Sequence, residues 1–215
     1  MKRARRIFAK PLLDWYHEHG RHSLPWREDS QTPFEILVAE VLLQRTTASA
    51  VSGAYVPFVT RYPTPECVVA ASSDELAERI APLGLTKRAR YLARCSAELL
   101  ARHGGEVPQR RSELLSIHGI GEYTARSVLV HAFGAQTTAV DTNVRRLVSR
   151  FFGIDPGSIG VDVVADAVVP QERSSDFLHA MLDFAADVCT AREPACRRCP
   201  LESRCRYAAS PDAIS

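Results

Sequence analysis

The sequence predicts an all-α protein of about ten short helices. Apolar residues recur every three or four positions along nearly the whole chain, and the alternation typical of a half-buried strand is not sustained anywhere. Glycine and proline interrupt the pattern at intervals that suit short helices. With 215 residues, 46% hydrophobic and 24% charged, the chain can bury one substantial core or two smaller ones.

The helical segments follow one another along the chain. Their apolar positions are Ile7, Leu12 and Trp15; Ile36, Leu37, Val41 and Leu42; Leu76, Ile80 and Leu83; Tyr91, Leu92, Leu99 and Leu100; Val128, Leu129 and Ala132; Val144, Leu147 and Val148; and Phe177, Met181 and Phe184. Helix starts are predicted at Thr32-Pro33, Ser72-Ser73-Asp74-Glu75, Thr86-Lys87 and Asp141-Thr142. Breaks are predicted at Tyr62 to Pro65, Pro82 to Gly84, His103 to Gly105 and Gly153 to Gly160.

The charge pattern suits a polyanionic partner. The net charge is only +2, but it is distributed in blocks: +5 in 1–27, −5 in 28–82, +6 in 83–150, −6 in 151–188, +3 in 189–206 and −1 in 207–215. Basic blocks that share one face would bind nucleic acid, and the alternative is a set of solvated helix faces.

No apolar run approaches the roughly 18 residues of a membrane span, and no secretory signal is evident. We therefore expect a soluble, cytoplasmic protein.

The cysteines indicate a metal centre near the C-terminus. Four of the six form a C-x6-C-x2-C-x5-C pattern, namely Cys189, Cys196, Cys199 and Cys205. In a chain that is not secreted, such a group suits metal ligation better than disulfides. Zinc sites usually combine two C-x2-C pairs, so the single pair and wider arms favour a [4Fe–4S] cluster over zinc. Cys67 and Cys95 are expected to be small buried side chains.

A second motif is the stretch from Leu114 to Ala125, where two helical patterns flank the turn Gly119-Ile120-Gly121. Glycine permits positive φ and close approach of another surface. The turn leads into the N-terminus of a helix, whose free N–H groups bind anions such as a DNA phosphate. A plain αα-corner is the alternative, but the surrounding basic block favours DNA.

Asp141 follows this turn in the sequence Val140-Asp141-Thr142-Asn143. It suits a helix N-cap. A carboxylate close to a deoxyribose also stabilises an oxocarbenium-like cation or activates water. The two roles are compatible.

Together these motifs resemble the helix-hairpin-helix DNA glycosylases of the endonuclease III and MutY superfamily, from Pro25-Trp26-Arg27 to Cys205. The resemblance implies two helical domains with a DNA-binding cleft between them and a flipped base in the cleft. A six-helix barrel with the hairpin would span 28–135. A four-helix cluster domain would combine 1–27 with 136–215. The partner would be double-stranded DNA holding a mismatched or damaged base. The protein would be a monomer associated with the nucleoid.

The position of the lyase nucleophile separates the branches of this family. Where endonuclease III-like enzymes carry a lysine that attacks the sugar, this chain has Tyr123. Only three of the 27 basic residues are lysines, and Lys2, Lys10 and Lys87 do not match that position. The resemblance therefore implies a monofunctional glycosylase that uses water and has little or no lyase activity.

Glu40 is the candidate acid on the side of the base. It lies among Leu37, Val41 and Leu42, where burial costs free energy unless the carboxyl has a partner or a task. The alternative is an exposed glutamate on an amphipathic helix. The resemblance implies that it faces the extruded base, and an apolar setting would raise its pKa so that it donates a proton or hydrogen bond to the leaving base.

Further departures from the MutY pattern favour thymine or uracil opposite guanine over adenine opposite guanine or 8-oxoguanine. They are Gln44-Arg45-Thr46-Thr47, Gly84-Leu85-Thr86-Lys87-Arg88-Ala89 and Thr142. These resemble the Mig-type thymine-DNA glycosylases. The ten residues after Cys205 also leave no room for the C-terminal domain with which MutY enzymes check for 8-oxoguanine. Another damaged base is the remaining alternative.

The resemblance assigns the other site residues to DNA. Gln44 and Arg45 would enter the duplex and contact the orphaned guanine, unless they form a solvated helix end. Gly119 and Gly121 would bind phosphate, and the supporting cations would be Arg88, Arg145 and Arg146. The rival classes are a non-catalytic binder of distorted DNA and an iron–sulfur electron carrier. The carrier does not explain Glu40, Tyr123 and the hairpin together.

Overall fold

The computed structural model describes residues 2–84 and 87–210, and its regular structure is entirely helical there. The chain forms two compact units, one from residues 1–21 and 134–215 and the other from His22–Phe133. The boundaries expected from the resemblance were 27/28 and 135/136. No helix in the described part is long and apolar enough to cross a membrane. The all-α prediction is confirmed.

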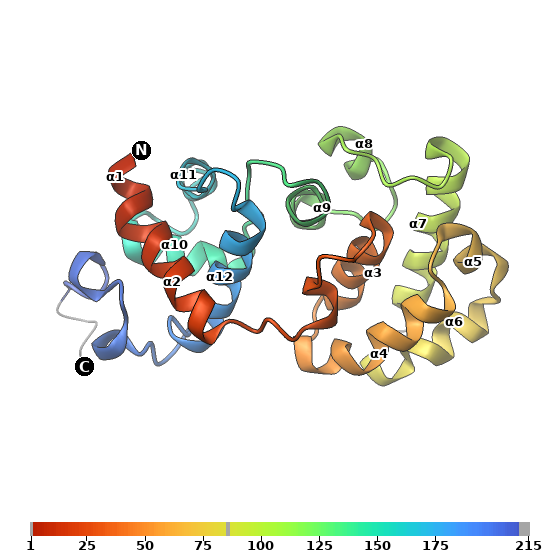
Figure 1. The fold of residues 1–215 in the computed structure, drawn as a ribbon, viewed down its shortest axis with the longest axis horizontal. Helices are drawn as coiled ribbons and strands as arrows, with labels where there is room; N and C mark the ends of the chain where they lie inside the picture. Colours follow the sequence, from red (N-terminus) through yellow and green to blue (C-terminus); the bar gives the residue numbers. More distant parts are fainter. Residues whose placement is uncertain (1, 85–86, 211–215) are drawn as a thin grey trace. The chain divides into compact units, whose positions relative to one another are not determined.

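The His22–Phe133 unit contains seven α-helices in its described residues (Figure 1). They are α3 (Pro33–Leu43), α4 (Ala48–Arg61), α5 (Pro65–Ala70), α6 (Ser73–Ile80), α7 (Lys87–His103), α8 (Arg111–Leu115) and α9 (Glu122–Phe133). Short 3-10 turns occupy Pro25–Arg27 and Ala81–Leu83. The central helix is α3, which packs against α4, α7 and α9. Eight of its eleven residues are buried, so it forms the core of this unit.

Local capping explains where these helices begin. Thr32 and Ser72 each form a capping box with the glutamate three residues later, Glu35 and Glu75. Both starts were predicted. Helix α7 begins at Lys87 in the described part of the chain, at the predicted place, whereas Leu85 and Thr86 lie outside the described residues. Helix α4 was not marked by an expected apolar set, because Gly53 and Pro57 interrupt its pattern.

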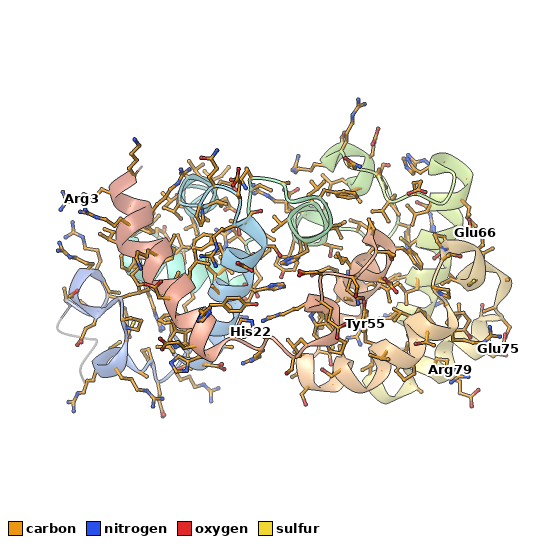
Figure 2. The ribbon with its side chains drawn as sticks, in the orientation of Figure 1. Arg3, His22, Tyr55, Glu66, Glu75 and Arg79 are labelled. Carbon is orange, nitrogen blue, oxygen red and sulfur yellow. The ribbon has the colours of Figure 1, made fainter. Side chains whose placement is uncertain are left out.

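Tyr55 of α4, labelled in Figure 2, packs against the segment that precedes α3. Its ring meets Trp26 edge to face, with centroids 5.6 Å apart. Its hydroxyl donates to Gln31 and to the carbonyl of Glu35. Burial raises the pKa of Tyr55 above its ordinary value, and the nearby Glu35 and Glu28 carboxylates add to the shift. The segment before α3 is thereby held against α4.

The other unit combines both ends of the chain (Figure 1). Its described helices are α1 (Lys2–Ala4), continued by a π-helical turn (Arg5–Ala9) into α2 (Lys10–His19), and α10 (Thr142–Phe152), α11 (Gly160–Ala167) and α12 (Ser174–Asp187). Helix α12 packs against α2 and α10. The core is aromatic, with the Phe8 ring centroid 4.8 Å from that of Phe151 and 6.1 Å from that of Phe177. This packing fixes the C-terminal end of α10, the helix whose N-cap is Asp141.

After α12 the chain has little regular structure. Only two 3-10 turns, Cys196–Arg198 and Glu202–Arg204, interrupt the loops up to Ser210. This segment contains the four clustered cysteines. Of the other two, Cys95 is buried as predicted, and burial raises its pKa to about 12. The prediction for Cys67 is wrong: the residue is partly exposed beside Thr64, because the short helix α5 turns it away from the core.

Candidate active site and cysteine centre

The helix-hairpin-helix motif consists of α8, the turn from Ser116 to Gly121 and α9. Gly119 has φ +85°, a conformation that favours glycine. Gly121 does not have positive φ, and a Cβ added there would meet nothing within 4 Å. The turn therefore needs Gly119 for its conformation, whereas Gly121 leaves open space at the exposed start of α9.

An arginine neutralises the acidic first residue of α9. Arg111 of α8 forms a bidentate pair with Glu122, at 2.8 Å (Nε–Oε1) and 2.5 Å (Nη2–Oε2). The carboxylate favours the positive end of the helix dipole, and its pairing reduces repulsion of a second anion there. The anion-binding geometry inferred from the sequence is compatible with this arrangement.

Two polar side chains, one in α3 and one directly after it, bond to the hairpin and α9. Glu40, only 8% exposed, accepts a hydrogen bond of 2.8 Å from the Ser127 hydroxyl. One turn later Gln44 donates to the carbonyl of Gly119 at 3.3 Å and to the Thr124 hydroxyl at 3.5 Å. The alternative of an exposed Glu40 is thus wrong. Glu40 and Gln44 together join the C-terminal end of α3 to the hairpin and α9.

Tyr123 belongs to the same region of α9. It precedes Ser127 by one helical turn, so the two side chains share a face of the helix. Tyr123 is partly exposed, whereas Ser127 is fully buried. A buried acid and a partly exposed phenol therefore lie near the hairpin within one unit.

The turn after α3 has unusual backbone geometry. Arg45 has φ 55°, which is uncommon outside glycine, and its side chain is exposed. Arg88 of α7 was expected to support a phosphate, yet it is 2% exposed and donates from Nη2 to the carbonyl of Gln44. Burial lowers the pKa of Arg88. Its observed partner is the protein's own backbone.

In the other unit, Asp141 is the N-cap of α10, as predicted. Its Oδ1 accepts from the backbone N–H of Asn143 and Val144 at 2.8 and 2.7 Å, and its Oδ2 accepts from Asn143 Nδ2 at 3.0 Å. Both carboxylate oxygens are thereby held in one orientation. A fixed carboxylate of this kind suits electrostatic stabilisation of a developing cation.

The expected DNA-supporting arginines of α10 also bind the protein itself. Arg145 pairs with Asp162 at 2.7 Å. Arg146 donates to the Asn143 side chain and to the carbonyls of Ala185 and Cys189, at 3.0, 2.8 and 3.0 Å. A chain of hydrogen bonds therefore runs from Asp141 through Asn143 and Arg146 to the backbone of the first clustered cysteine. The sequence analysis did not find this link.

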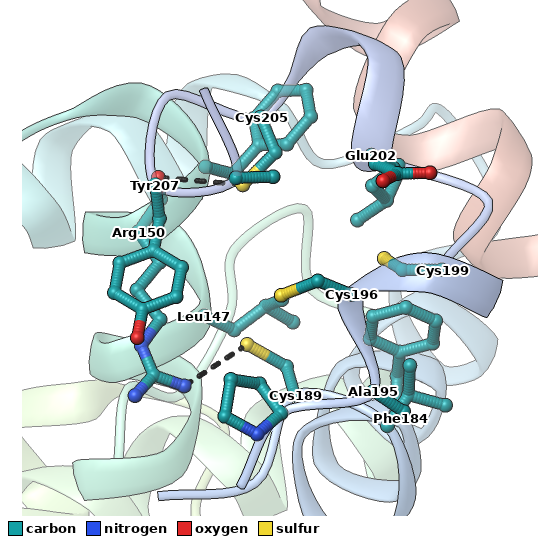
Figure 3. Close-up of a pocket in the computed structure, with 15 residues that line it drawn as sticks. Leu147, Arg150, Phe184, Cys189, Ala195, Cys196, Cys199, Glu202, Cys205 and Tyr207 are labelled. Carbon is teal, nitrogen blue, oxygen red and sulfur yellow. Dashed lines mark hydrogen bonds between the residues drawn. The ribbon is translucent and has the colours of Figure 1, made fainter. Parts of the chain in front are cut away.

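The four clustered cysteines line one pocket (Figure 3). Its apolar wall includes Leu147, Phe151, Phe184 and Leu201. Burial raises the pKa of Cys199 to about 11, and neighbouring thiolates add to the shift. Burial likewise raises the pKa of Cys196. Several thiolates in such a place require compensation by cations. The geometry brings together the residues that the sequence spacing predicted.

Arg150, one turn after Arg146, borders this pocket and was missed from the sequence. It donates to Cys189 Sγ at 3.6 Å and to the carbonyls of Thr190 and Ala191 at 2.6 and 2.9 Å. Its guanidinium also lies 4.5 Å from the centroid of the Tyr207 ring. The four-residue spacing of Arg146 and Arg150, which places both on one face of α10, was the signal in the sequence that could have identified Arg150. Arg150 anchors the loop that carries Arg192.

Comparison with known proteins identifies the family. Residues 38–162 match the model of the HhH-GPD superfamily of base excision DNA repair proteins. The chain belongs to this family. The match includes the hairpin and Asp141, two of the three motifs on which the resemblance was based, and confirms the resemblance, while the cysteine segment lies beyond residue 162.

Individual relatives agree with this assignment. The thymine-DNA glycosylase of Aeropyrum pernix is 36% identical over 91% of this chain and 92% of its own. The adenine DNA glycosylase of Mycolicibacterium smegmatis is 38% identical over 91% of this chain and 68% of its own. The solved structure of a thermostable thymine-DNA glycosylase superposes with a TM-score of 0.90 at 31% identity, covering 96% of this chain and 97% of that chain. The chain is a DNA glycosylase of base excision repair.

Proposed function

We propose that this glycosylase hydrolyses the N-glycosidic bond of a thymine or uracil opposite guanine and does not cleave the strand. The observation that carries the proposal is the pairing of buried Glu40 with Ser127, one turn from Tyr123. An acid is thus available on the base side, and the hairpin position of a lyase lysine holds a phenol. The similarity to thymine-DNA glycosylases supports the same substrate.

In the proposed reaction the C1′–N bond breaks and the base leaves with the bonding electrons. Glu40 donates a proton or hydrogen bond to the base, which lowers the energy of its departure. Asp141 stabilises the positive charge on the sugar or accepts a proton from the attacking water. The oxygen of that water adds to C1′, and an abasic site remains. Tyr123 lines the pocket and cannot form a Schiff base.

Double-stranded DNA with a mismatched base is the proposed partner. The open space at Gly121 and the N-terminus of α9 would take a backbone phosphate. Gln44 and Arg45, on the adjoining turn, would contact the nucleotide left unpaired. We further propose that the protein acts as a monomer and in the cytoplasm, where DNA is accessible to it.

We also propose that Cys189, Cys196, Cys199 and Cys205 bind a [4Fe–4S] cluster. They line one pocket, yet no three Cys, His, Asp or Glu side chains among the described residues are grouped as ligands of a single ion. The C-x6-C-x2-C-x5-C spacing in the sequence supports a cubane, in which each thiolate binds a different iron. When bound, the cluster would supply the positive charge that four thiolates require and a one-electron redox couple. Arg150 and Arg146 orient the first ligand.

The decisive experiment is a panel of labelled duplexes with T·G, U·G, A·G, A·8-oxoguanine and ordinary pairs, assayed with and without alkali. We expect base release from T·G and U·G, and strand breaks only after alkali. Release of adenine alone would instead support the adenine glycosylase, which the Mycolicibacterium relative makes the second candidate.

Asp141→Asn separates an enzyme from a simple binder. Asparagine is an equally good N-cap, so the fold should persist while base release falls by roughly 100-fold or more. DNA affinity should be retained. Asp155→Asn is the control, because Asp155 makes only a local turn with Gly157. Unchanged base release in Asp141→Asn would remove this residue from the mechanism.

A further inference from the structure

The C-terminal end of α3 is held by an interaction from a different helix. Gln44 is the residue after the last turn of α3, and its backbone N–H donates to the carbonyl of Val41 at 3.4 Å. The last carbonyls of a helix lack partners within it. Here the guanidinium of Arg88, from α7, donates to the carbonyl of Gln44.

Arg88 is buried in an unfavourable way. Its side chain is 2% exposed, and its Nε and Nη1 have no hydrogen-bond partner in the described part of the chain. An arginine remains charged in proteins, and burying a charge with unsatisfied donors is destabilising. A long apolar side chain would fill the same space without that cost. Arg88 is therefore poorly explained as a packing residue.

The turn that Arg88 contacts has a left-handed backbone conformation at Arg45. The bonded carbonyl immediately precedes Arg45, whose φ of 55° is in the left-handed region. A non-glycine residue held in that region is strained, so the turn needs support from outside itself. A cation at a helix C-terminus also interacts favourably with the helix dipole.

Gln44 also bonds to the hairpin. The side chain of Gln44 donates to the carbonyl of Gly119 and to Thr124. Gln44 therefore contacts α7 through its backbone and the hairpin through its side chain. A change at Arg88 would be transmitted to both Arg45 and the phosphate-binding turn.

We propose that Arg88 is a positioning residue: its buried guanidinium fixes the Gln44–Arg45 turn against the hairpin before DNA binds. It does not touch the phosphate. The consequence for DNA rests on the proposed function, but the ordering of the turn is a property of the free protein. Arg88 therefore lowers the stability of the free protein, and in return the turn is already ordered when DNA binds.

Hydrogen exchange of the free protein tests this directly. In Arg88→Met, the amides of Gln44 and Thr46, which donate to the carbonyls of Val41 and Leu43, should exchange at least about tenfold faster. Those within α9 and α12 should be unchanged. The thermal midpoint should not fall, because an unsatisfied buried charge is removed. Arg90→Met, on the exposed side of α7, is the matched control and should leave both measurements unchanged.

Two outcomes would overturn the proposal. One is unchanged exchange at Gln44 and Thr46 in Arg88→Met. The other is faster exchange spread equally over α3, α7 and α9 with a lower thermal midpoint, which would mark a merely structural residue. If Arg88→Met does not fold, Arg88→Gln, which is polar but shorter, carries the same expectations.

A second measurement connects the turn to DNA. On a T·G duplex, Arg88→Met should weaken binding by about tenfold, and single-turnover base release at saturating protein should change far less. Arg88→Lys should restore part of the affinity. An inactive wild-type protein would count against the proposed function only, whereas the exchange result decides the role of Arg88 independently.

Discussion

Arg45 combines an exposed guanidinium with a backbone conformation that suits glycine. The substitutions Arg45→Gly and Arg45→Ala separate these two features. Both remove the side chain, but only glycine relieves the left-handed strain, so Arg45→Gly should be the more stable by about 1 kcal/mol. Thermal or urea unfolding measures this difference.

Binding to mismatched DNA gives the second comparison at Arg45. If the guanidinium contacts the unpaired guanine, both variants should lose affinity for a T·G duplex to a similar extent. A loss confined to Arg45→Ala would show instead that only the backbone conformation of the turn matters.

Tyr123 gives a prediction about the type of chemistry. A lysine at this position would place an amine where the family's lyases have one, on the face of α9 that also carries Ser127. We expect borohydride to trap a covalent adduct of Tyr123→Lys with DNA through a Schiff base. Tyr123→Phe serves as the control and should give no adduct. Trapping with the wild-type protein would contradict the monofunctional proposal.

At the scale of elements, α10 connects Asp141 with the cysteine loop. Asn143 links the Asp141 carboxylate to Arg146, with both bonds at 3.0 Å, and Arg146 continues to the carbonyl of Cys189. Asn143→Ala should leave the backbone cap of α10 intact and free one carboxylate oxygen. Because orientation contributes strongly to catalysis, base release should fall by roughly tenfold or more while DNA affinity changes little. Loss of affinity without loss of rate would contradict this prediction.

Elements were predictable where their determinants are local. Thr32, Ser72 and Asp141 cap helices through bonds to residues at most three positions away, so the sequence reveals them. Glu40–Ser127 and Arg88–Gln44 join residues 87 and 44 positions apart. No spacing rule anticipates such contacts. For this reason Glu40 was identified only as a candidate, and Arg88 was assigned to phosphate although it is buried.

For the whole molecule, the two units differ in what stabilises them. The His22–Phe133 unit is built on the almost fully buried helix α3. The segment from Cys189 to Cys205 has only two 3-10 turns, and only one of its side chains, that of Leu201, is buried. Such a segment has too little apolar burial to order itself, and metal binding supplies the missing free energy in comparable sites.

Removal of iron should therefore act on one unit. The purified protein should be yellow-brown and contain iron, and Cys199→Ser or exhaustive chelation should abolish the colour. Amides in 189–205 and at the C-terminal end of α12 should then exchange faster, whereas those of α3 and α9 keep their protection. A colourless zinc protein would refute the cluster. Equal loss of protection in α3 would show instead that the two units unfold together, in which case the cluster stabilises the entire chain.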